Sequence, residues 1–167
     1  IRRMIIARMN TVRPTCRLPS GERVPRFGVG TWRMGEQRGE RTRELDGAHI
    51  EFLRGVGNPI GCKVGPSMSG EDVIALCEAI NPARLPGRLT LITRMGADKI
   101  EDGLRPLLRS VRRSGHPVVW ACDPMHANTF TAPSGRKTRH FDSILAEIKG
   151  FFAAHGAEAT WAGGVHV

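Results

Sequence analysis

The feature that most constrains the fold is a regular alternation of short apolar runs with amphipathic segments from residue 58 onward. Apolar runs occupy residues 58–64, 89–93 and 118–121, and another begins near residue 164. Each run has the length of a buried strand, and the segments between them carry apolar residues at helical spacing. This alternation predicts an α/β fold built on a parallel sheet.

The segments between the runs contain signals for helix starts and stops. Residues 69–72 form a capping-box pattern that predicts the start of a helix. In the next segment, Pro106 is expected near the start of a helix that Gly115 ends. A last helix, ended by Gly156, is predicted to bury one stripe of apolar residues, namely Phe141, Ile144, Leu145, Ile148 and Phe152.

The spacing of the expected strands is that of a repeated strand–helix unit. Strands start near residues 58, 88, 117 and 164, and the last gap is longer because residues 129–140 form a loop. A (β/α)8 barrel typically needs about 250 residues, so this stretch predicts roughly half of one, a partial TIM barrel. The open edges of such a sheet are compatible with a homo-oligomer.

The N-terminal part of the chain has a different pattern. Residues 11–13 and 17–25 predict a hairpin with a Ser20-Gly21 turn, and residues 27–32 predict a short strand. No run is long enough to span a membrane, and the first residues lack the features of a secretory signal. We therefore expect a cytoplasmic protein.

The net charge and the cysteines bear on whether the chain binds nucleic acid or a structural zinc ion. The formal net charge is +9, which leaves a nucleic-acid-binding or assembly protein as an alternative to an enzyme. The arginines are scattered, however, and no series of aromatic residues accompanies them, so nucleic acid is not the expected partner. The four cysteines contain no C-x-x-C pair, and Cys62 and Cys77 are expected in the core.

Three strand ends carry basic side chains that suggest a common site. Lys63 and Arg94 each close an apolar run, and His126 follows the third run by a few residues. Barrel enzymes place their catalytic groups at the carboxyl ends of strands. The three residues therefore predict a site for an anionic substrate, with room for a metal.

Several motifs occur in the order of a known family over residues 39–167. They comprise Gly39–His49, the strands that end at Lys63 and Arg94, Cys122–His126, Lys137–Phe141 and Gly163–Val167. On these motifs the chain resembles the class II (plant-type) 3-deoxy-D-arabino-heptulosonate 7-phosphate (DAHP) synthases of the shikimate pathway, which leads to the aromatic amino acids. The resemblance implies a TIM-barrel transferase that joins phosphoenolpyruvate, erythrose 4-phosphate and water into DAHP and phosphate.

The resemblance also implies roles for individual residues, although it assigns no catalytic residue. The positions that match phosphoenolpyruvate-binding residues are Glu40, Arg41, Lys63 and Arg94. Lys137 and Arg139 are candidates for contacts with the sugar phosphate, and His126 matches one ligand of a divalent metal, manganese or cobalt. Arginine suits bidentate contacts with carboxylate or phosphate, and lysine supplies a point charge.

A second, shorter resemblance covers residues 17–36, which are similar to the opening hairpin and first strand of aldo-keto reductases. That family needs a catalytic tyrosine, and the chain contains no tyrosine. The second alternative is therefore that the chain is an aldo-keto reductase fragment, but the catalytic tyrosine for that chemistry is missing. The two resemblances predict a division into a foreign segment, 1–38, and a partial DAHP synthase barrel, 39–167.

The sequence departs from the synthase pattern at the metal site. The family holds its metal through a Cys, a His, a Glu and an Asp, and only the His is matched, at His126; Cys16 has no matching context. We therefore expect this chain to be inactive or nearly so. Ala127 also stands where the family has a glycine, which would strain the loop if the position required a positive φ.

Overall fold

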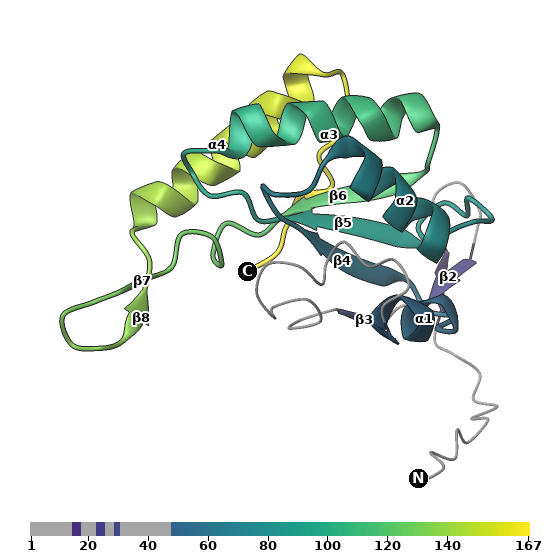
Figure 1. Cartoon of the computed structure of the whole chain (residues 1–167), viewed down its shortest axis with the longest axis horizontal. Helices are drawn as coiled ribbons and strands as arrows, with labels where there is room; N and C mark the ends of the chain where they lie inside the picture. The colour runs from purple at the N-terminus through teal and green to yellow at the C-terminus, as the bar shows by residue number, and fades with distance from the viewer. Residues whose placement is uncertain (1–14, 18–22, 26–28, 31–47) are drawn as a thin grey trace, which may run out of the picture.

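A five-stranded parallel sheet forms the centre of the molecule, as expected from the sequence (Figure 1). The computed structural model describes residues 15–17, 23–25, 29–30 and 48–167, with side chains from residue 50 onward. The strand order is β3-β4-β5-β6-β9, which follows the order of the chain. These strands are, in turn, Val29–Gly30, Ile60–Val64, Leu89–Thr93, Val118–Cys122 and Gly164–Val165.

The helices connect neighbouring strands and cover one face of the sheet. They are α1 (Ala48–Arg54), α2 (Gly70–Ile80), α3 (Ile100–Ser114) and α4 (Phe141–Ala157). Figure 1 shows α2, α3 and α4 on the same side of the sheet. Each helix packs against the next one, α1 on α2, α2 on α3 and α3 on α4. Four successive helices therefore follow the sheet in the direction of the chain.

Side chains alternate between the two faces of the sheet, and the face under the helices forms the core. In β4 the residues at positions 60, 62 and 64 are buried, and Gly61 and Lys63 point to the other face. Cys62 and Cys77 both belong to this core, as predicted. Burial raises the pKa of Cys62 to about 12 and that of Cys77 to about 11, so both thiols remain protonated and unreactive at neutral pH.

Two helix-boundary predictions are confirmed in detail. The Ser69 hydroxyl accepts a hydrogen bond from the Asp72 backbone N–H at 3.1 Å, and the Asp72 carboxylate accepts one from the Ser69 N–H at 2.8 Å. This reciprocal capping box satisfies two N–H groups at the start of α2. At the end of α3, Gly115 has a φ of 70°, the left-handed conformation that favours glycine after a helix.

The prediction that Pro106 lies near the start of α3 is wrong. The helix begins at Ile100, and Pro106 lies inside it on the solvent side. Proline costs one backbone hydrogen bond there. The buried side chains of Ile100 and Leu104 hold the first turn against the core and offset this cost.

The face that α4 buries also differs from the predicted one. Phe141, Leu145 and Phe152 are 72%, 36% and 48% exposed, and the two isoleucines of that stripe are half-buried. The helix instead buries Glu147, Gly150, Phe151, Ala154 and His155. Two of these five are polar and one is glycine, so the buried face carries a weaker hydrophobic signal than the exposed one.

The remaining strands form two small antiparallel pairs. Near the N-terminus, β1 (Thr15–Arg17) pairs with β2 (Arg23–Pro25), as expected for a hairpin; the arm predicted at residues 11–13 lies outside the described residues. Within the segment predicted as a loop, β7 (Phe130–Thr131) pairs with β8 (Lys137–Thr138). None of the helices in the described part of the chain combines the length and apolar character needed to cross a bilayer.

Candidate anion-binding site at the carboxyl edge of the sheet

The sheet register brings the ends of four strands into one row. Val64, Thr93, Cys122 and Val165 are aligned across β4, β5, β6 and β9. The residues that follow three of these strands continue the ladder, because the N–H groups of Arg94, Asp123 and His166 donate to the carbonyls of Val64, Thr93 and Cys122 at 2.9, 2.7 and 2.7 Å. Side chains alternate along a strand, so Arg94, Asp123 and His166 lie on the same face as Lys63, away from the helices.

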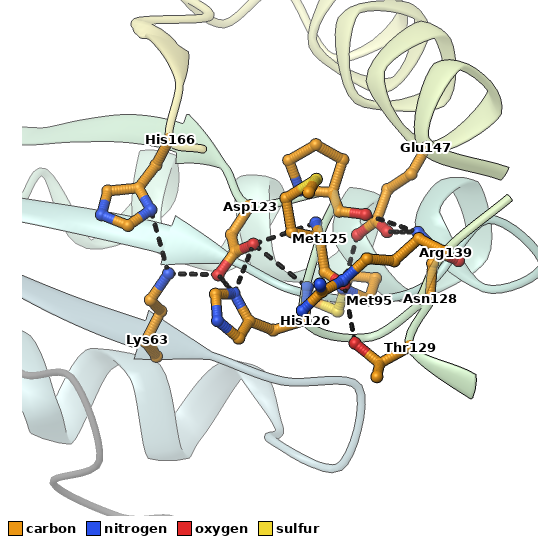
Figure 2. Close-up of polar contacts among 11 residues, drawn as sticks. Lys63, Met95, Asp123, Met125, His126, Asn128, Thr129, Arg139, Glu147 and His166 are labelled. Atoms are coloured by element: carbon orange, nitrogen blue, oxygen red, sulfur yellow. Dashed lines mark hydrogen bonds and ion pairs between the residues drawn. The ribbon is translucent and has the colours of Figure 1, made fainter. Parts of the chain in front are cut away.

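Asp123 is the centre of the polar contacts in this row (Figure 2). Its carboxylate is fully buried and forms a short ion pair with the Lys63 ammonium, whose side chain is 18% exposed. The backbone N–H groups of Met125 and His126 also donate to Asp123 Oδ1, at 3.0 and 3.2 Å. The carboxylate therefore holds both a lysine from β4 and the turn that follows β6.

The same carboxylate also fixes the orientation of the His126 ring. His126 Nδ1 lies 2.7 Å from Asp123 Oδ2 and 2.9 Å from Oδ1. An ionised carboxylate only accepts hydrogen bonds, so Nδ1 carries the proton that is shared with Asp123. In the neutral imidazole, Nε2 is then the nitrogen with a free lone pair, and it points away from Asp123.

His166 is brought to the site by the edge strand β9. Its Nδ1 lies 3.3 Å from Lys63 Nζ, and its side chain is exposed. An ammonium group only donates, so His166 Nδ1 accepts this hydrogen bond and the ring proton lies on Nε2 in the neutral form. Lys63 is thus held from two sides by Asp123 and His166.

Opposing effects act on the pKa of Asp123. Burial would raise it, but hydrogen bonds from Lys63 and His126 and from the Met125 N–H lower it below its usual value. The group is therefore charged at neutral pH, and it neutralises part of the positive charge of its neighbours.

A second buried carboxylate, Glu147 in α4, braces the loops around the site. Glu147 accepts hydrogen bonds from the Met95 N–H at 2.8 Å and from the Asn128 side-chain amide at 2.6 Å. Asn128 in turn donates to the Pro124 carbonyl at 2.8 Å and accepts from the Ala97 N–H at 3.1 Å. These contacts tie the loop after β5 to the loop after β6. Burial raises the pKa of Glu147 above its ordinary value, although its hydrogen bonds oppose the shift.

The predicted site residues fall into three groups. Lys63, Arg94 and His126 lie together at the carboxyl edge of the sheet, as described above. Arg139 is half-buried, and its Nε donates to the Met125 carbonyl at 3.0 Å, so it supports the turn that contains His126. Lys137 is an exposed residue of β8. Glu40 and Arg41 lie outside the described residues.

Sequence reasoning gave too little weight to three residues of this site. Asp123 directly follows a predicted buried strand, and that position could have identified it. Glu147 carried no such signal, because it lies on a helix face predicted to be exposed. His166 was included only as part of the Gly163–Val167 motif, without a role in the site. Their contribution depends on the register of β9 and the rotation of α4.

The strain expected at Ala127 is absent from the described loop. The described non-glycine residues with positive φ are Arg84 and Ala159, and Ala127 is not among them. Alanine therefore fits this position without the penalty expected for a residue that replaces an obligatory glycine.

His126 is the described residue at this edge whose side chain is oriented to bind a metal ion. His126 Nε2 is oriented by a carboxylate on the other ring nitrogen, which is a common arrangement for metal-binding histidines. Within the described residues, however, no group of three or more His, Cys, Asp or Glu side chains is placed to hold a metal ion. The described residues therefore supply one metal ligand, His126, and do not form a complete metal site.

Comparisons with known proteins identify relatives over most of the chain. The class-II DAHP synthetase family model matches residues 37–167. The chain is 51% identical over 129 residues to phospho-2-dehydro-3-deoxyheptonate aldolase AroG of Mycolicibacterium smegmatis, which covers 77% of this chain and 28% of that protein. It is 55% identical over 129 residues to phospho-2-dehydro-3-deoxyheptonate aldolase of Streptomyces coelicolor, with 77% and 29% covered.

A plant protein shows the same relationship. Identity to a probable chloroplastic phospho-2-dehydro-3-deoxyheptonate aldolase of Catharanthus roseus is 54% over 125 residues, which are 75% of this chain and 25% of that protein. The chain thus spans between a quarter and a third of the length of the curated relatives that it matches. Because the family match covers residues 37–167 and so includes every residue of the site, the chain belongs to the class-II DAHP synthetase family.

Proposed function

We propose that the carboxyl edge of the sheet is the phosphoenolpyruvate-binding part of a DAHP synthase. The overall reaction joins phosphoenolpyruvate, erythrose 4-phosphate and water into DAHP and phosphate. The observation that carries the proposal is the convergence of Lys63, Arg94 and His126, from three neighbouring strands, in a chain of the DAHP synthetase family.

The chemistry of this edge suits a small dianionic substrate. Phosphoenolpyruvate carries a carboxylate and a phosphate, and Arg94 can form bidentate contacts with either group. Lys63 adds a point charge whose position is fixed by Asp123 and His166. Lys137 and Arg139 lie farther along the chain and are proposed to contact the phosphate of erythrose 4-phosphate. Glu40 and Arg41 are proposed as further phosphoenolpyruvate-binding residues.

The strand order supports a barrel architecture for the complete fold. A doubly wound sheet reverses its strand order at a switch point, and its helices cover both faces. Here the order β3-β4-β5-β6-β9 follows the chain without reversal, and α2, α3 and α4 share one face. We therefore propose that the described strands form part of a TIM barrel, with the proposed substrate edge at its carboxyl end.

A divalent metal, manganese or cobalt, is proposed to bind at His126 Nε2. Such an ion would polarise the aldehyde carbonyl of erythrose 4-phosphate. Since the described residues supply one ligand, we expect the 167-residue chain to bind phosphoenolpyruvate but to show no turnover. The foreign character of residues 1–38 and the cytoplasmic location stay predictions.

Calorimetric titration with phosphoenolpyruvate tests the proposed site. We expect binding by the 167-residue chain, and a loss of about tenfold or more in affinity in Arg94→Ala, as expected for a lost charge-assisted contact. Lys63→Ala should also weaken binding, but it leaves Asp123 without its cation, so Arg94→Ala is the cleaner variant. Arg113→Ala, an exposed arginine in the last turn of α3, is the control.

Two results would contradict the proposal. One is that the chain does not bind phosphoenolpyruvate, and the other is that Arg94→Ala and Lys63→Ala both bind it with the affinity of the original chain. Turnover is measured separately as manganese-dependent loss of phosphoenolpyruvate in the presence of erythrose 4-phosphate. Turnover by the 167-residue chain would refute the expected inactivity and would support the substrate assignment.

A further inference from the structure

Two histidines lie at the carboxyl edge of the sheet, and their rings contact neighbours of opposite charge. His126 Nδ1 contacts the Asp123 carboxylate, and His166 Nδ1 contacts the Lys63 ammonium at 3.3 Å (Figure 2). A neutral imidazole has one nitrogen that donates and one that accepts. The charged neighbour of each ring therefore decides which nitrogen carries the proton.

The two rings are held in opposite tautomers. An ammonium group only donates, so the His166 nitrogen that faces Lys63 supplies a lone pair, and the proton of the neutral ring is on Nε2. The Asp123 carboxylate only accepts, so His126 keeps its proton on Nδ1 and has the lone pair on Nε2. The outer nitrogen of His126 therefore suits a cation, whereas the outer N–H group of His166 suits an oxygen of an anion.

The backbone places His166 beside the residues proposed to bind phosphoenolpyruvate. Its N–H donates to the Cys122 carbonyl at 2.7 Å and continues the ladder that also includes Arg94. The side chains of His166, Arg94 and Lys63 consequently share one face of the sheet. Because the His166 ring contacts the Lys63 ammonium, an anion that binds to this ammonium lies next to the ring.

The charges around Lys63 explain why a neutral donor beside it would add affinity. The fully buried Asp123 carboxylate neutralises part of the Lys63 charge. Of the three N–H groups of the ammonium, the described contacts with Asp123 and His166 use two, which leaves one for a substrate. A carboxylate or a phosphate has more acceptor positions than this one donor can fill. The N–H group of His166 is available for another of these positions.

We propose that His166 is a further phosphoenolpyruvate-binding residue, which donates a hydrogen bond from Nε2 to an anionic oxygen of the substrate, and that Lys63 sets the tautomer this contact requires. The inference rests on the proposed function, because it adds a contact to the same site. It gives the two histidines different ligands. His126 is oriented for a metal ion, whereas neutral His166 has no free lone pair for a metal while it contacts Lys63.

Calorimetric titration of two variants with phosphoenolpyruvate separates this contact from a role in holding Lys63. In His166→Gln the amide can donate near the position of Nε2, but no acceptor remains near the position of Nδ1. In His166→Asn the shorter amide can accept near the position of Nδ1, but no donor reaches the position of Nε2. We expect about a tenfold loss of affinity in His166→Asn, as for a lost hydrogen bond to a charged group, and a loss of less than about threefold in His166→Gln.

The control is His140→Asn, which replaces an exposed histidine at the N-cap of α4 and should keep the affinity of the original chain. Circular dichroism checks that each variant folds. Imidazole ¹⁵N chemical shifts of the full 167-residue chain without substrate, at about pH 8 so that neutral rings are observed, measure the tautomers independently. The expected proton positions are Nε2 in His166 and Nδ1 in His126, and Lys63→Ala should give His166 a mixture of both tautomers.

Three results would overturn the proposed contact. They are a proton on Nδ1 of His166, an unchanged affinity in His166→Asn, and a loss in His166→Gln as large as that in His166→Asn. If Arg94→Ala still weakens binding in these cases, the proposed function stands and only the role of His166 is wrong. A chain that does not bind phosphoenolpyruvate at all would overturn both.

Discussion

Asp123 and His126, three residues apart after the same strand, form a carboxylate–imidazole pair with Nδ1 and Oδ2 at 2.7 Å. The pair fixes which ring nitrogen of His126 is available to a substrate or a metal, and the same carboxylate holds Lys63. Asp123 is therefore a positioning residue for two groups of the proposed site, and its removal should affect both at once.

Asp123→Asn is expected to lower the affinity for phosphoenolpyruvate by about tenfold or more. An asparagine is uncharged and has one oxygen and one NH₂ group. If its oxygen accepts from Lys63 and His126 as Asp123 Oδ2 does, its NH₂ group faces the backbone N–H groups of Met125 and His126, which are also donors. Calorimetric titration measures the affinity, and ¹⁵N chemical shifts of the imidazole measure the ring tautomer, which should become mixed. Asp98→Asn, an exposed residue after β5, is the control. Unchanged affinity together with an unchanged His126 tautomer would contradict the positioning role.

Glu147→Gln is expected to destabilise the fold by about 1–3 kcal/mol. The new NH₂ group would face either the Met95 N–H or the Asn128 amide, both of which are donors. Urea unfolding measures the loss, and hydrogen exchange of the Met95 amide reports the loosening of the loop after β5. Glu101→Gln changes an exposed carboxylate of α3 and should have little effect. Equal stability of the two variants would show that the hydrogen bonds of Glu147 to the loops do not stabilise the fold.

Gly150→Ala is expected to destabilise the contact between α3 and α4. A Cβ at this position would lie 2.4 Å from Ile100 Cγ2, so one of the helices must move, at a cost of about 1–3 kcal/mol. Gly156→Ala is a matched control in the same helix, since its Cβ would meet no atom within 4 Å. Removal of a helical glycine there should stabilise the protein by about 0.5–1 kcal/mol. Thermal unfolding distinguishes the two, and shifts of the same sign would contradict the packing seen at Gly150.

Stability is expected to fall in acid because of Glu158, the residue after α4. Hydrogen bonds from Arg109 and Arg105 lower the pKa of Glu158 from 4.5 to about 2. A carboxylate with a depressed pKa in the folded state stabilises the fold above its unfolded pKa, and this contribution is lost as the pH falls through the folded pKa. The loss therefore occurs between pH 4.5 and about 2.

Urea unfolding at several pH values across this window should show a flatter dependence in Glu158→Gln than in the original chain. Glu71→Gln, which removes an exposed carboxylate from the first turn of α2, should retain the slope of the original chain. The same slope in all three proteins would mean that the arginine–Glu158 contacts do not contribute to the acid sensitivity.

The sequence predicted the elements whose signals are local. The Ser69–Asp72 capping box, the bounds of β5 and the left-handed Gly115 depend on neighbouring residues, and all three are confirmed. The exposed face of α4 was predicted as buried because its phenylalanines form the stronger apolar stripe. The helix instead buries the other face, where Gly150 leaves room for the Ile100 side chain of α3 and where Glu147 accepts hydrogen bonds from the loops.

The site was predicted less completely than the fold. Lys63, Arg94 and His126 were identified from their positions after apolar runs and from the family motifs, and the structure brings them to one edge. The carboxylates that position them were not assigned to the site, because an Asp or a Glu in isolation gives no sign of its partners. The contact of Asp123 with His126 is local, but its contact with Lys63 depends on the register of β4 against β6 by way of β5.

The arrangement of strands and helices in chain order has a consequence for the dynamics of the site. Each strand–helix unit makes its main contacts with the units next to it, so stability accumulates along the layer much as it does in a stack of repeats. Strands β5 and β6, which pair through five residues, should then open last, whereas β9 pairs with β6 through two residues and should open sooner. Lys63 and Asp123 are therefore expected to keep fixed positions, while His166 next to β9 is expected to move on a faster timescale than the rest of the site.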